Sequence, residues 1–560
     1  MKERPSPHQH PAVKNRNARA RAERERNAAT STPSIATYTG PDYVPAELDG
    51  RMKVQARREI KIVVPHDFSE GHLDYTEPSN PLNQLGAVPE QCVPLVTSAD
   101  FESFMASFNK RCNFMQAGAA DDLDDVSFKE AQDIISALPG DLFSEWDDND
   151  RDRARWMDKF DPGKKARMAA AYAEIPGATS AYIGKKDLSV KQECLIKRDD
   201  PEWAPRVIYA GNDVFNAVTG PASMVVMERL VEMTRTHKIT FGEVKVEYAY
   251  KTTDVKLCDF LFDDPELKDT IEGDYSRNDR EQRSRTALLY DAFLAKIKMP
   301  QWFRTLLLDL EHYTVVNHRY GFRAKLAFQL PTGTTSTTPR NSLYNTLMFA
   351  VSCRRQKRRA RAVILGDDLL ARINKRFDLD AWIRSVASFK MVLKAKAPRI
   401  NGEATFLSRR IFAEVDRPCM VPLLGKMLVR FNVRSTTNQQ VTDSQYMAGK
   451  ALSYAYECRH VPFLSDLFMR RYEMEGDNDK VTPQDMTWFA KTSGLGREDL
   501  IEAIKHEPVK IDEWDFGAWC CEQYDLDLED VRELFESIVL NPSCEMVDVP
   551  NLSKMQCDLG

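Results

Sequence analysis

The spacing of hydrophobic residues changes along the chain and predicts an order of helices and strands. Residues 528–540 place a set of apolar side chains on one helical face, namely Val531, Leu534, Phe535, Ile538 and Val539. Residues 497–507 predict another helix, so the last part of the chain is expected to be mainly helical. Residues 284–298 and 301–318 also predict helices, the second starting just after Pro300. Between about residues 240 and 415, strand-like and helical segments mix, which indicates an α+β fold.

One strand-like pair carries two acids at its tip. The apolar runs Ala362–Leu365 and Leu369–Leu370 flank Gly366, Asp367 and Asp368. This pattern predicts a buried strand, a turn and a second strand, with both carboxylates at the turn. The plain interpretation is a solvated hairpin turn, because Gly-Asp and Asp-Asp suit turns. A functional interpretation needs partner groups elsewhere in the chain.

Composition sets the broad class of the protein. The chain has 560 residues, of which 42% are hydrophobic and 29% charged, so it can bury a sizeable core and is not globally disordered. A net charge of -6 neither indicates nor excludes a nucleic-acid partner, because partners respond to local fields. Residues 1–35 are basic and rich in Pro, Asn and Ala, and we expect a disordered tail there.

Cysteine usage and hydropathy bear on the compartment. The 11 cysteines include no C-x-x-C pair and no zinc spacing, which is typical of a reducing compartment. No apolar run approaches the roughly 18 residues of a membrane-spanning helix, and no signal-peptide core is visible. We therefore expect a soluble protein whose attachment to any membrane is indirect.

A second pair of acids lies upstream of the hairpin. Asp274 follows an expected strand, and Asp279 comes five residues later. If Asp274 faces Asp367 from a neighbouring strand, the two carboxylates repel each other unless cations lie between them. Oxygen ligands without histidine or cysteine suit Mg²⁺, with Mn²⁺ as a second candidate, rather than zinc. Two such ions about 3.5–4 Å apart can stabilise the attacking and leaving oxygens of a phosphoryl transfer.

A polar helix start lies between the two acidic segments. Thr338 is expected to cap this helix, with Pro339 as its first residue. Asn341 then lies in the first turn, and Asn345 lies one turn later on the same face. The alternative is an ordinary capped helix whose hydroxyls only satisfy backbone groups.

Three basic segments accompany the acids, and each has a solvated surface as its alternative. The first, upstream, could face a triphosphate and contains Lys191, Lys197, Arg198 and Arg206. The second follows the acid pair and contains Lys390, Lys394 and Lys396, then Ser408, Arg409 and Arg410. The third, Arg354–Arg361, could act as a nuclear import signal or bind template phosphates. For this run we favour a solvated connection.

In their order along the chain, these segments resemble the motifs of RNA-dependent RNA polymerases of positive-strand RNA viruses. The basic fingers motif matches Lys191, Glu193, Pro205, Arg206 and Ile208. The first palm motif matches Asp274 and Asp279, the second Thr332, Gly333, Thr337 and Asn341, and the third Gly366, Asp367 and Asp368. The fifth motif matches Phe406 to Arg409. The resemblance spans about residues 190–410 and is strongest to nodavirus and tombusvirus polymerases.

Two positions depart from the family pattern. Thr332 stands where serine is common, which keeps the hydroxyl, and Asn278 stands where an aromatic residue often precedes the second acid. The second departure puts the packing of that loop in doubt but not the chemistry.

The resemblance implies a right-hand polymerase. The fingers and an N-terminal extension would occupy residues 36–272, and a helical thumb with a C-terminal tail would occupy 413–560. The palm, an antiparallel sheet with flanking helices, would occupy 273–412 with a fingers insertion between 280 and 330. The end of the thumb, residues 541–560, would either fold back toward the site or be unstructured.

The resemblance also assigns roles. Asp274 and Asp367 would hold the metals with help from Asp368, while Lys191 and Arg206 would neutralise the triphosphate. Three further residues would contact the nucleotide, namely Asp279, Thr337 and Asn341. A lysine after the palm acids would protonate pyrophosphate; Lys396 is favoured, with Lys394 close behind.

Template and product RNA and NTPs are the implied partners, together with other viral replication proteins, because no capping or helicase motif is visible. The implied location is the host cytoplasm, in a viral replication complex. Two alternatives stay open. A reverse transcriptase would prefer an aromatic residue before its acid pair, where this chain has Gly366. A non-catalytic RNA-binding protein would explain the basic tail but not the ordered acids.

Overall fold

The structure is a computed structural model of the chain. It describes three short strands before residue 84 and, beyond them, residues 84–97, 100–108, 111–112, 114–116, 122–191, 194–195, 205–276, 278–374, 376–398, 403–413, 418–434, 441–482, 485–487, 490, 493–507 and 510–559. Residues 1–33, Glu193, Lys197 and Arg198 lie outside the described residues, so the expectations for them stay predictions.

A five-stranded sheet carries both acidic segments. Its strand order is β10 (Val244–Tyr248), β14 (Ala360–Leu365), β15 (Asp368–Ile373), β11 (Asp269–Tyr275) and β16 (Leu393–Lys396). Neighbouring strands are antiparallel except β10 and β14, which are parallel. Every residue of β14 is buried, because helices cover the sheet. The mixture of helices and sheets agrees with the expected α+β class.

Helices α7 (Asp213–Arg235), α12 (Thr337–Gln356) and α13 (Leu379–Ala387) belong to the same hydrophobic core as this sheet. Helix α12 begins at Thr337 with Ser336 as its N-cap, so the expected cap at Thr338 is wrong. Pro339 is the third helical residue, where its missing N–H still costs nothing, because the first turn has no carbonyl to bond. This shift of the helix start leaves Asn341 and Asn345 on one helical face.

A second, six-stranded sheet joins segments from distant parts of the chain. Its order is β1 (Ser34–Thr37), β3 (Lys61–Val64), β13 (Phe322–Ala327), β12 (His312–Asn317), β7 (Lys185–Val190) and β9 (Val207–Gly211). Helix α11 (Gln301–Asp309) ends before β12, so the helix predicted over 301–318 is wrong in its second half. Tyr313 and Val315 pack in the core beneath this sheet. Residues 312–317 form a strand rather than a helix because β12 pairs with β13 and β7.

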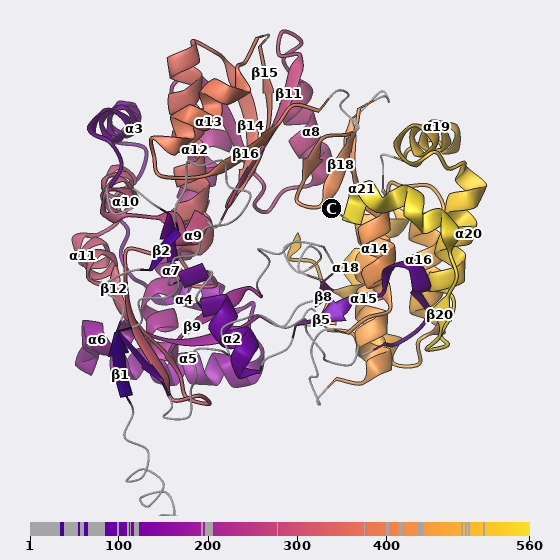
Figure 1. Ribbon diagram of the computed structural model, residues 1–560, viewed down its shortest axis with the longest axis horizontal. Coiled ribbons are helices and arrows are strands. Elements are labelled where there is room, and N and C mark those ends of the chain that lie inside the picture. Colours follow the sequence, from indigo (N-terminus) through magenta and orange to yellow (C-terminus); the bar gives the residue numbers. More distant parts are fainter. Residues whose placement is uncertain are drawn as a thin grey trace, which may run out of the picture.

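The C-terminal part is helical and has its own hydrophobic core, as Figure 1 shows in orange and yellow. It contains α14 (Leu424–Phe431), α15 (Asp443–Glu457), α16 (Leu464–Met474), α18 (Arg497–Lys505), α19 (Glu513–Tyr524) and α20 (Leu528–Val539). The predicted apolar face of α20 is confirmed, because all five of its residues are buried. Beside this region, β17 (Thr405–Phe406), β18 (Arg409–Phe412) and β19 (Cys419–Pro422) form a small antiparallel sheet.

The end of the chain folds back onto this small sheet. In α21 (Gln556–Leu559), the buried Asp558 accepts hydrogen bonds from Arg410 at 2.9 and 3.0 Å and from Tyr524 at 2.9 Å. Upstream, β20 (Met546–Val547) pairs in parallel with β4 (Val88–Pro89). The expectation of an unstructured end is therefore wrong for residues 541–559, and the C-terminus lies beside β18 and α14 (Figure 1), whereas folding back toward the site stays a prediction.

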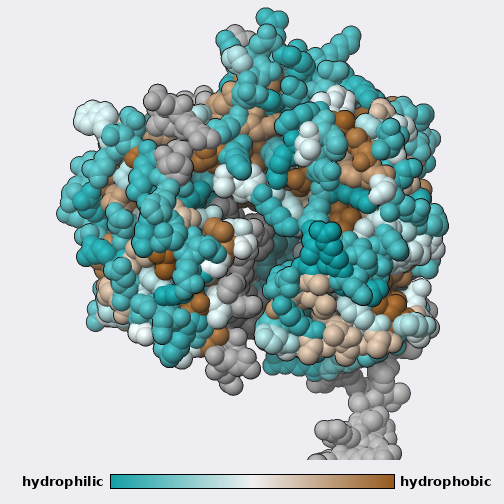
Figure 2. All heavy atoms as spheres, turned by 180° about the vertical axis from the view of Figure 1, so that it is seen from behind, coloured by the Kyte–Doolittle hydropathy of each residue, from teal (hydrophilic) through white to brown (hydrophobic). Residues whose placement is uncertain are grey.

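The remaining helices surround the two sheets. They are α2 (Phe101–Phe108), α3 (Asp125–Ala137), α4 (Asp150–Met157), α5 (Pro162–Glu174), α6 (Ser180–Ile183), α8 (Asp254–Phe262), α9 (Asn278–Glu281) and α10 (Ser284–Lys296). None of the helices in the described residues combines the length and the apolar character needed to cross a bilayer. The face shown in Figure 2 is mostly hydrophilic, with hydrophobic residues scattered over it.

Candidate active site

The Gly366–Asp367 turn presents the acids at the tip of the β14–β15 hairpin. Leu365 pairs with Asp368, so the loop holds two residues, and the predicted strand–turn–strand is confirmed. Gly366 has a φ of 64°, which a two-residue hairpin of the primed type requires at its first position. Asp367 therefore stands at the tip, and Asp368 is the first residue of β15.

Asp274 joins these acids from the neighbouring strand. Gly273 of β11 pairs with Leu369 of β15, and one further step of the same register places Asp274 opposite Asp368. Directly opposed side chains in antiparallel strands have Cβ atoms about 5 Å apart. Gly273 permits this packing, because a Cβ there would lie 2.7 Å from the Trp382 ring.

The carboxylates repel one another across the site. Burial, with the charges of Asp279 and Asp274, raises the pKa of Asp367 to about 6. Burial, with the charges of Asp367 and Asp274, raises the pKa of Asp368 to about 7. Asp367 reaches solvent at the mouth of the site, yet protein atoms surround it closely enough to disfavour its charge. A cation bound between these groups would relieve the repulsion.

The donor set fits a hard divalent cation. Asp274, Asp367 and Asp368 offer only oxygen ligands, which Mg²⁺ and Mn²⁺ prefer. Among the residues that the structure describes, no three His, Cys, Asp or Glu side chains are already arranged as a metal-ligand cluster. The three acids suit a divalent ion by their oxygen atoms and by their positions on adjacent strands, and not by side chains already arranged around one centre.

Asp279 and Asn341 form the polar part of the site. Asn341 Nδ2 donates to Asp279 Oδ1 at 2.7 Å, and the Thr332 hydroxyl donates to the other carboxylate oxygen. Burial raises the pKa of Asp279, while these two hydrogen bonds and the charge of Arg206 oppose the rise. Gln282 Nε2 donates to Asn341 Oδ1 at 2.7 Å, which sets the orientation of the Asn341 amide.

Thr337 lies nearby, but its hydroxyl makes hydrogen bonds within the loop that carries Thr332. Its Oγ1 donates to the Pro331 carbonyl at 3.1 Å and lies 3.2 Å from the Thr334 hydroxyl. The predicted nucleotide contact of Thr337 therefore does not appear in this structure as a side chain directed into the site. Its visible effect is to order the loop that carries Thr332.

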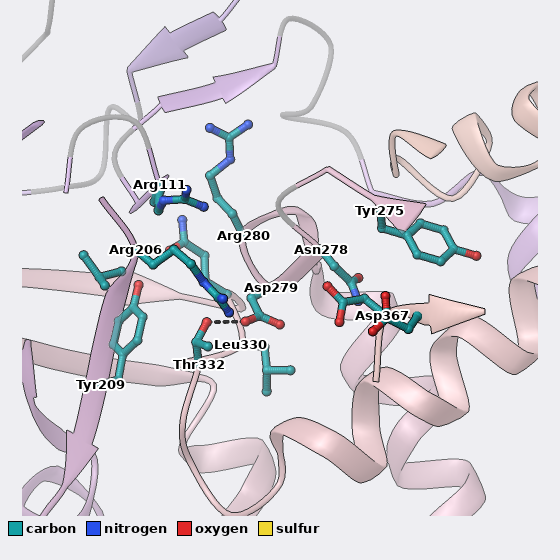
Figure 3. A pocket seen from close by; sticks show the side chains of 13 residues that line it. Arg111, Arg206, Tyr209, Tyr275, Asn278, Asp279, Arg280, Leu330, Thr332 and Asp367 are labelled. Carbon is teal, nitrogen blue, oxygen red and sulfur yellow. Dashed lines mark hydrogen bonds between the residues drawn. The ribbon is translucent and has the colours of Figure 1, made fainter. Parts of the chain in front are cut away.

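A pocket of about 370 Å³ joins the acidic and basic residues. Asp279, Thr332, Asp367 and Asp368 line it, and so do Arg111, Arg206 and Arg280, which we call the arginine cluster. Figure 3 shows Arg111 and Arg206 on one side, Asp367 on the opposite side and Asp279 between them, while the Arg280 side chain points away from Asp279. The volume lies within the usual range of small-ligand sites.

Sequence reasoning missed two members of the arginine cluster. Arg280 directly follows Asp279, and this adjacency was a signal that could have been used. Arg111 had no comparable signal, because it reaches the pocket through tertiary contacts such as the 3.0 Å bond from its Nε to the Pro205 carbonyl. The described backbone of Lys191 donates to the Arg206 carbonyl at 2.7 Å, so these predicted partners are neighbours.

Of the basic residues that follow the acidic turn in the sequence, some lie near the site and others stabilise the fold. Lys394 pairs with Asp274 across β16 and β11, whereas Lys396 pairs with Glu272, one repeat further from the turn. Both arginines of β18 serve the scaffold, because Arg409 bonds to Glu457 at 3.3 Å and Arg410 to Asp558.

The run Arg354–Arg361 contacts acids on the protein itself. Arg355 pairs with Glu130, Arg359 with Glu266 and Arg361 with Asp263, each at 2.5 Å. The expected solvated connection is wrong for both ends of the run, because Arg354–Gln356 end α12 and Arg361 is buried in β14. The ion pairs favour a structural role over a role in import or template binding.

Carboxylates on two adjacent strands, facing arginines across a nucleotide-sized pocket, are typical of enzymes that transfer phosphoryl or nucleotidyl groups. The comparison with protein families is more specific. The family model described as RNA dependent RNA polymerase matches residues 97–494, which is more than half of the chain. The chain therefore belongs to this family and is a viral RNA-directed RNA polymerase. A search of curated proteins gave no match.

Proposed function

We propose that Asp274, Asp367 and Asp368 hold the divalent ions for template-directed transfer of nucleotides to an RNA 3′-hydroxyl. The observation that carries this is the register of β11 and β15, which sets Asp274 opposite Asp368 beside the turn of Asp367. Polymerases of this family generally use divalent metals, and the all-oxygen donor set supports Mg²⁺. When bound, such ions would stabilise the negative charge that develops on the attacking and leaving oxygens.

Arg111, Arg206 and Lys191 bind the triphosphate in this proposal, whereas Arg280 is buried and pairs with Glu281. Guanidinium groups make paired, charge-assisted hydrogen bonds to phosphate oxygens, and their charge does not depend on pH near neutrality. Arg206 is exposed to the pocket, and its charge acts on Asp279, Asp367 and Asp368. A triphosphate held there has its α-phosphate directed toward the acids.

The ribose is recognised by Asp279 and Asn341. A 2′-hydroxyl can donate to the Asp279 carboxylate and accept from Asn341 Nδ2. Thr332 and Gln282 hold these two side chains from behind. Thr337 contributes by ordering the loop of Thr332 rather than by direct contact.

For the leaving group we now favour Lys394 over Lys396 as the proton donor. Lys394 stands opposite Asp274, so its ammonium can reach a pyrophosphate that leaves the acidic site. The charge of Lys396 acts on Glu272, whose carboxylate also accepts two hydrogen bonds from Thr405 at 2.8 Å. Lys396 is therefore placed to support the strand.

The arrangement of the chain supports a right hand. The five-stranded sheet would be the palm, the six-stranded sheet the fingers and the C-terminal helices the thumb. Strands β12 and β13 lie between the two acidic segments in sequence and pair in the six-stranded sheet, as a fingers insertion would. Its implied setting is a replication complex in the host cytoplasm with other viral replication proteins, and its subgroup would be that of nodaviruses and tombusviruses.

The test is metal-dependent extension of an RNA primer on an RNA template. Asp274→Ala and Asp367→Ala should each lose at least ~10³-fold in rate, because metal and electrostatic terms supply several kcal/mol. RNA binding should persist, since the basic surfaces are unchanged. In the same panel Lys394→Met should slow extension more than Lys396→Met.

Each outcome separates the proposal from its alternatives. Near-normal extension by either aspartate variant would refute the assignment of the metal ligands, and equal rates for both lysine variants would refute the choice of Lys394. A reverse transcriptase would prefer deoxynucleotides on the same template. A non-catalytic RNA-binding protein would bind the primer–template without extending it.

A further inference from the structure

Asn345 contacts both acidic segments from the third turn of α12. Its side chain is fully buried, with 0% exposed. Its Nδ2 lies 3.3, 3.1 and 3.4 Å from the backbone carbonyls of Gly366, Asp367 and Asp368. Its Oδ1 accepts a hydrogen bond from the Tyr275 hydroxyl at 3.0 Å.

Tyr275 connects Asn345 to the strand that carries Asp274. It directly follows Asp274 in β11, and successive side chains in a strand point to opposite faces. The tyrosine therefore anchors the inner face of the strand against α12 while the aspartate projects from the outer face. A fixed tyrosine hydroxyl fixes the position of Asp274 relative to the helix.

The hairpin turn needs a donor at this place. The carbonyls of Gly366 and Asp367 lie in the turn, beyond the ladder between β14 and β15, and Asp368 is the last paired residue of that ladder. The amide nitrogen of Asn345 has only two hydrogens for three carbonyl oxygens, so these hydrogen bonds are shared. Their rather long distances agree with this sharing. Ser342 adds one more contact from α12, since its Oγ accepts from the Gly366 N–H at 2.8 Å.

We propose that Asn345 is the positioning residue that sets the separation of Asp274 from Asp367 and Asp368. This rests on the proposed function, in which those three acids hold the divalent ions. Asn345 touches no substrate and acts through backbone and Tyr275. Groups that orient metal ligands from behind change metal affinity or activity by about 10–100-fold when they are removed.

The test measures Mn²⁺ binding without nucleotide, by electron paramagnetic resonance, beside primer extension and thermal unfolding. Asn345→Ala should weaken Mn²⁺ binding by at least ~10-fold. Tyr275→Phe loses only the hydroxyl and should weaken it by a few-fold. The double variant should bind Mn²⁺ no more weakly than Asn345→Ala alone, because both single changes break the hydrogen bond between Tyr275 and Asn345.

Thr346→Val is the matched control. Thr346 is the next residue of α12 and is equally buried, but its hydroxyl bonds to the Tyr248 hydroxyl and the Ser342 carbonyl, both at 2.8 Å, and so to β10 and its own helix. It should lower the melting temperature about as much as Asn345→Ala and leave Mn²⁺ affinity unchanged. The comparison therefore separates positioning from plain support of the helix.

Unchanged Mn²⁺ affinity in Asn345→Ala, or an equal loss in Thr346→Val, would overturn the proposal. If Asn345→Ala does not fold, Tyr275→Phe decides, and wild-type Mn²⁺ affinity there would overturn it as well. The proposed function is judged separately, because wild-type extension and its loss in Asp367→Ala do not depend on any result at Asn345.

Discussion

Replacement of Asn341 by alanine should reduce the preference for ribonucleotides more than it reduces activity itself. In the structure Asn341 Nδ2 bonds directly to Asp279 at 2.7 Å, and Asn341 Oδ1 accepts from Gln282 at 2.7 Å. A ribose hydroxyl can insert between Asn341 and Asp279 and turn one hydrogen bond into two. A deoxyribose leaves the Asn341–Asp279 bond intact.

This geometry sets the magnitude. The two polar groups pair with each other when no ribose hydroxyl is present, so a deoxynucleotide leaves neither of them unpaired. The gain for ribose is therefore about one hydrogen bond to a carboxylate, worth roughly 1.5–3 kcal/mol. In Asn341→Ala the space left by the amide admits water, which pairs with Asp279 whichever sugar is bound, so this gain is lost. Since 1.4 kcal/mol corresponds to a factor of ten, the ratio of kcat/KM for the ribonucleotide to kcat/KM for the deoxyribonucleotide should narrow by ~10-fold or more.

The assay compares kcat/KM for ATP and dATP on one primer–template, with a melting curve for each variant. Gln282→Met is the matched variant: it removes only the donor behind Asn341 and should narrow the ratio by less than Asn341→Ala. If both rates fall together and the ratio stays that of the wild type, Asn341 supports the fold and does not recognise the sugar.

Two further variants test the basic side of the pocket and the stability of the six-stranded sheet. Arg206→Ala should raise the nucleotide KM by ~10-fold or more with little change in primer–template affinity, because it removes charge-assisted bonds to phosphate; a loss of RNA affinity alone would place Arg206 on the template path. Lys186 is buried, with its Nζ 3.2 Å from the Ile183 carbonyl and 3.1 Å from the Phe215 ring centre, and burial lowers its pKa well below the usual value. Burial of the charged form of Lys186 lowers the free energy of unfolding. This loss is absent above the pKa of about 10.4 that the lysine has in the unfolded chain, and it grows as the pH falls toward the lower pKa of the folded protein. Lys186→Met should therefore stabilise the fold by about 1–3 kcal/mol at neutral pH and by less near pH 10; urea unfolding at both pH values checks this, and an equal or reversed effect would contradict it.

The parts of the site that were predictable from sequence are those fixed by local chemistry. A glycine and two acids between apolar runs constrain a hairpin turn whatever surrounds it, so the position of Asp367 followed from the sequence. The spacing of Asn341 and Asn345 likewise placed both on one helical face, even though the expected helix start was two residues late.

Residues that depend on tertiary contacts were not predictable in this way. The segment 312–317 had enough apolar residues for a helix, and only pairing with β7 and β13 makes it a strand. Arg111 enters the pocket from a segment far from every motif, and Gln282 is buried behind Asn341. The arginines of β18 have the composition of a nucleic-acid contact, yet their partners Glu457 and Asp558 come from the C-terminal helices.

Helix α12 links the two tasks of the site. Asn341 contributes to the sugar-recognition pair, and Asn345, one turn further, contacts the acidic turn and Tyr275. Residues four apart on a helix are about 6 Å apart and move together with the helix axis. A displacement of α12 would therefore change the sugar contact and the spacing of the acids at once. Because Gln282 and Ser342 further tie this helix to its surroundings, the fold resists such a displacement, and sugar recognition and acid geometry are held in a single relative position.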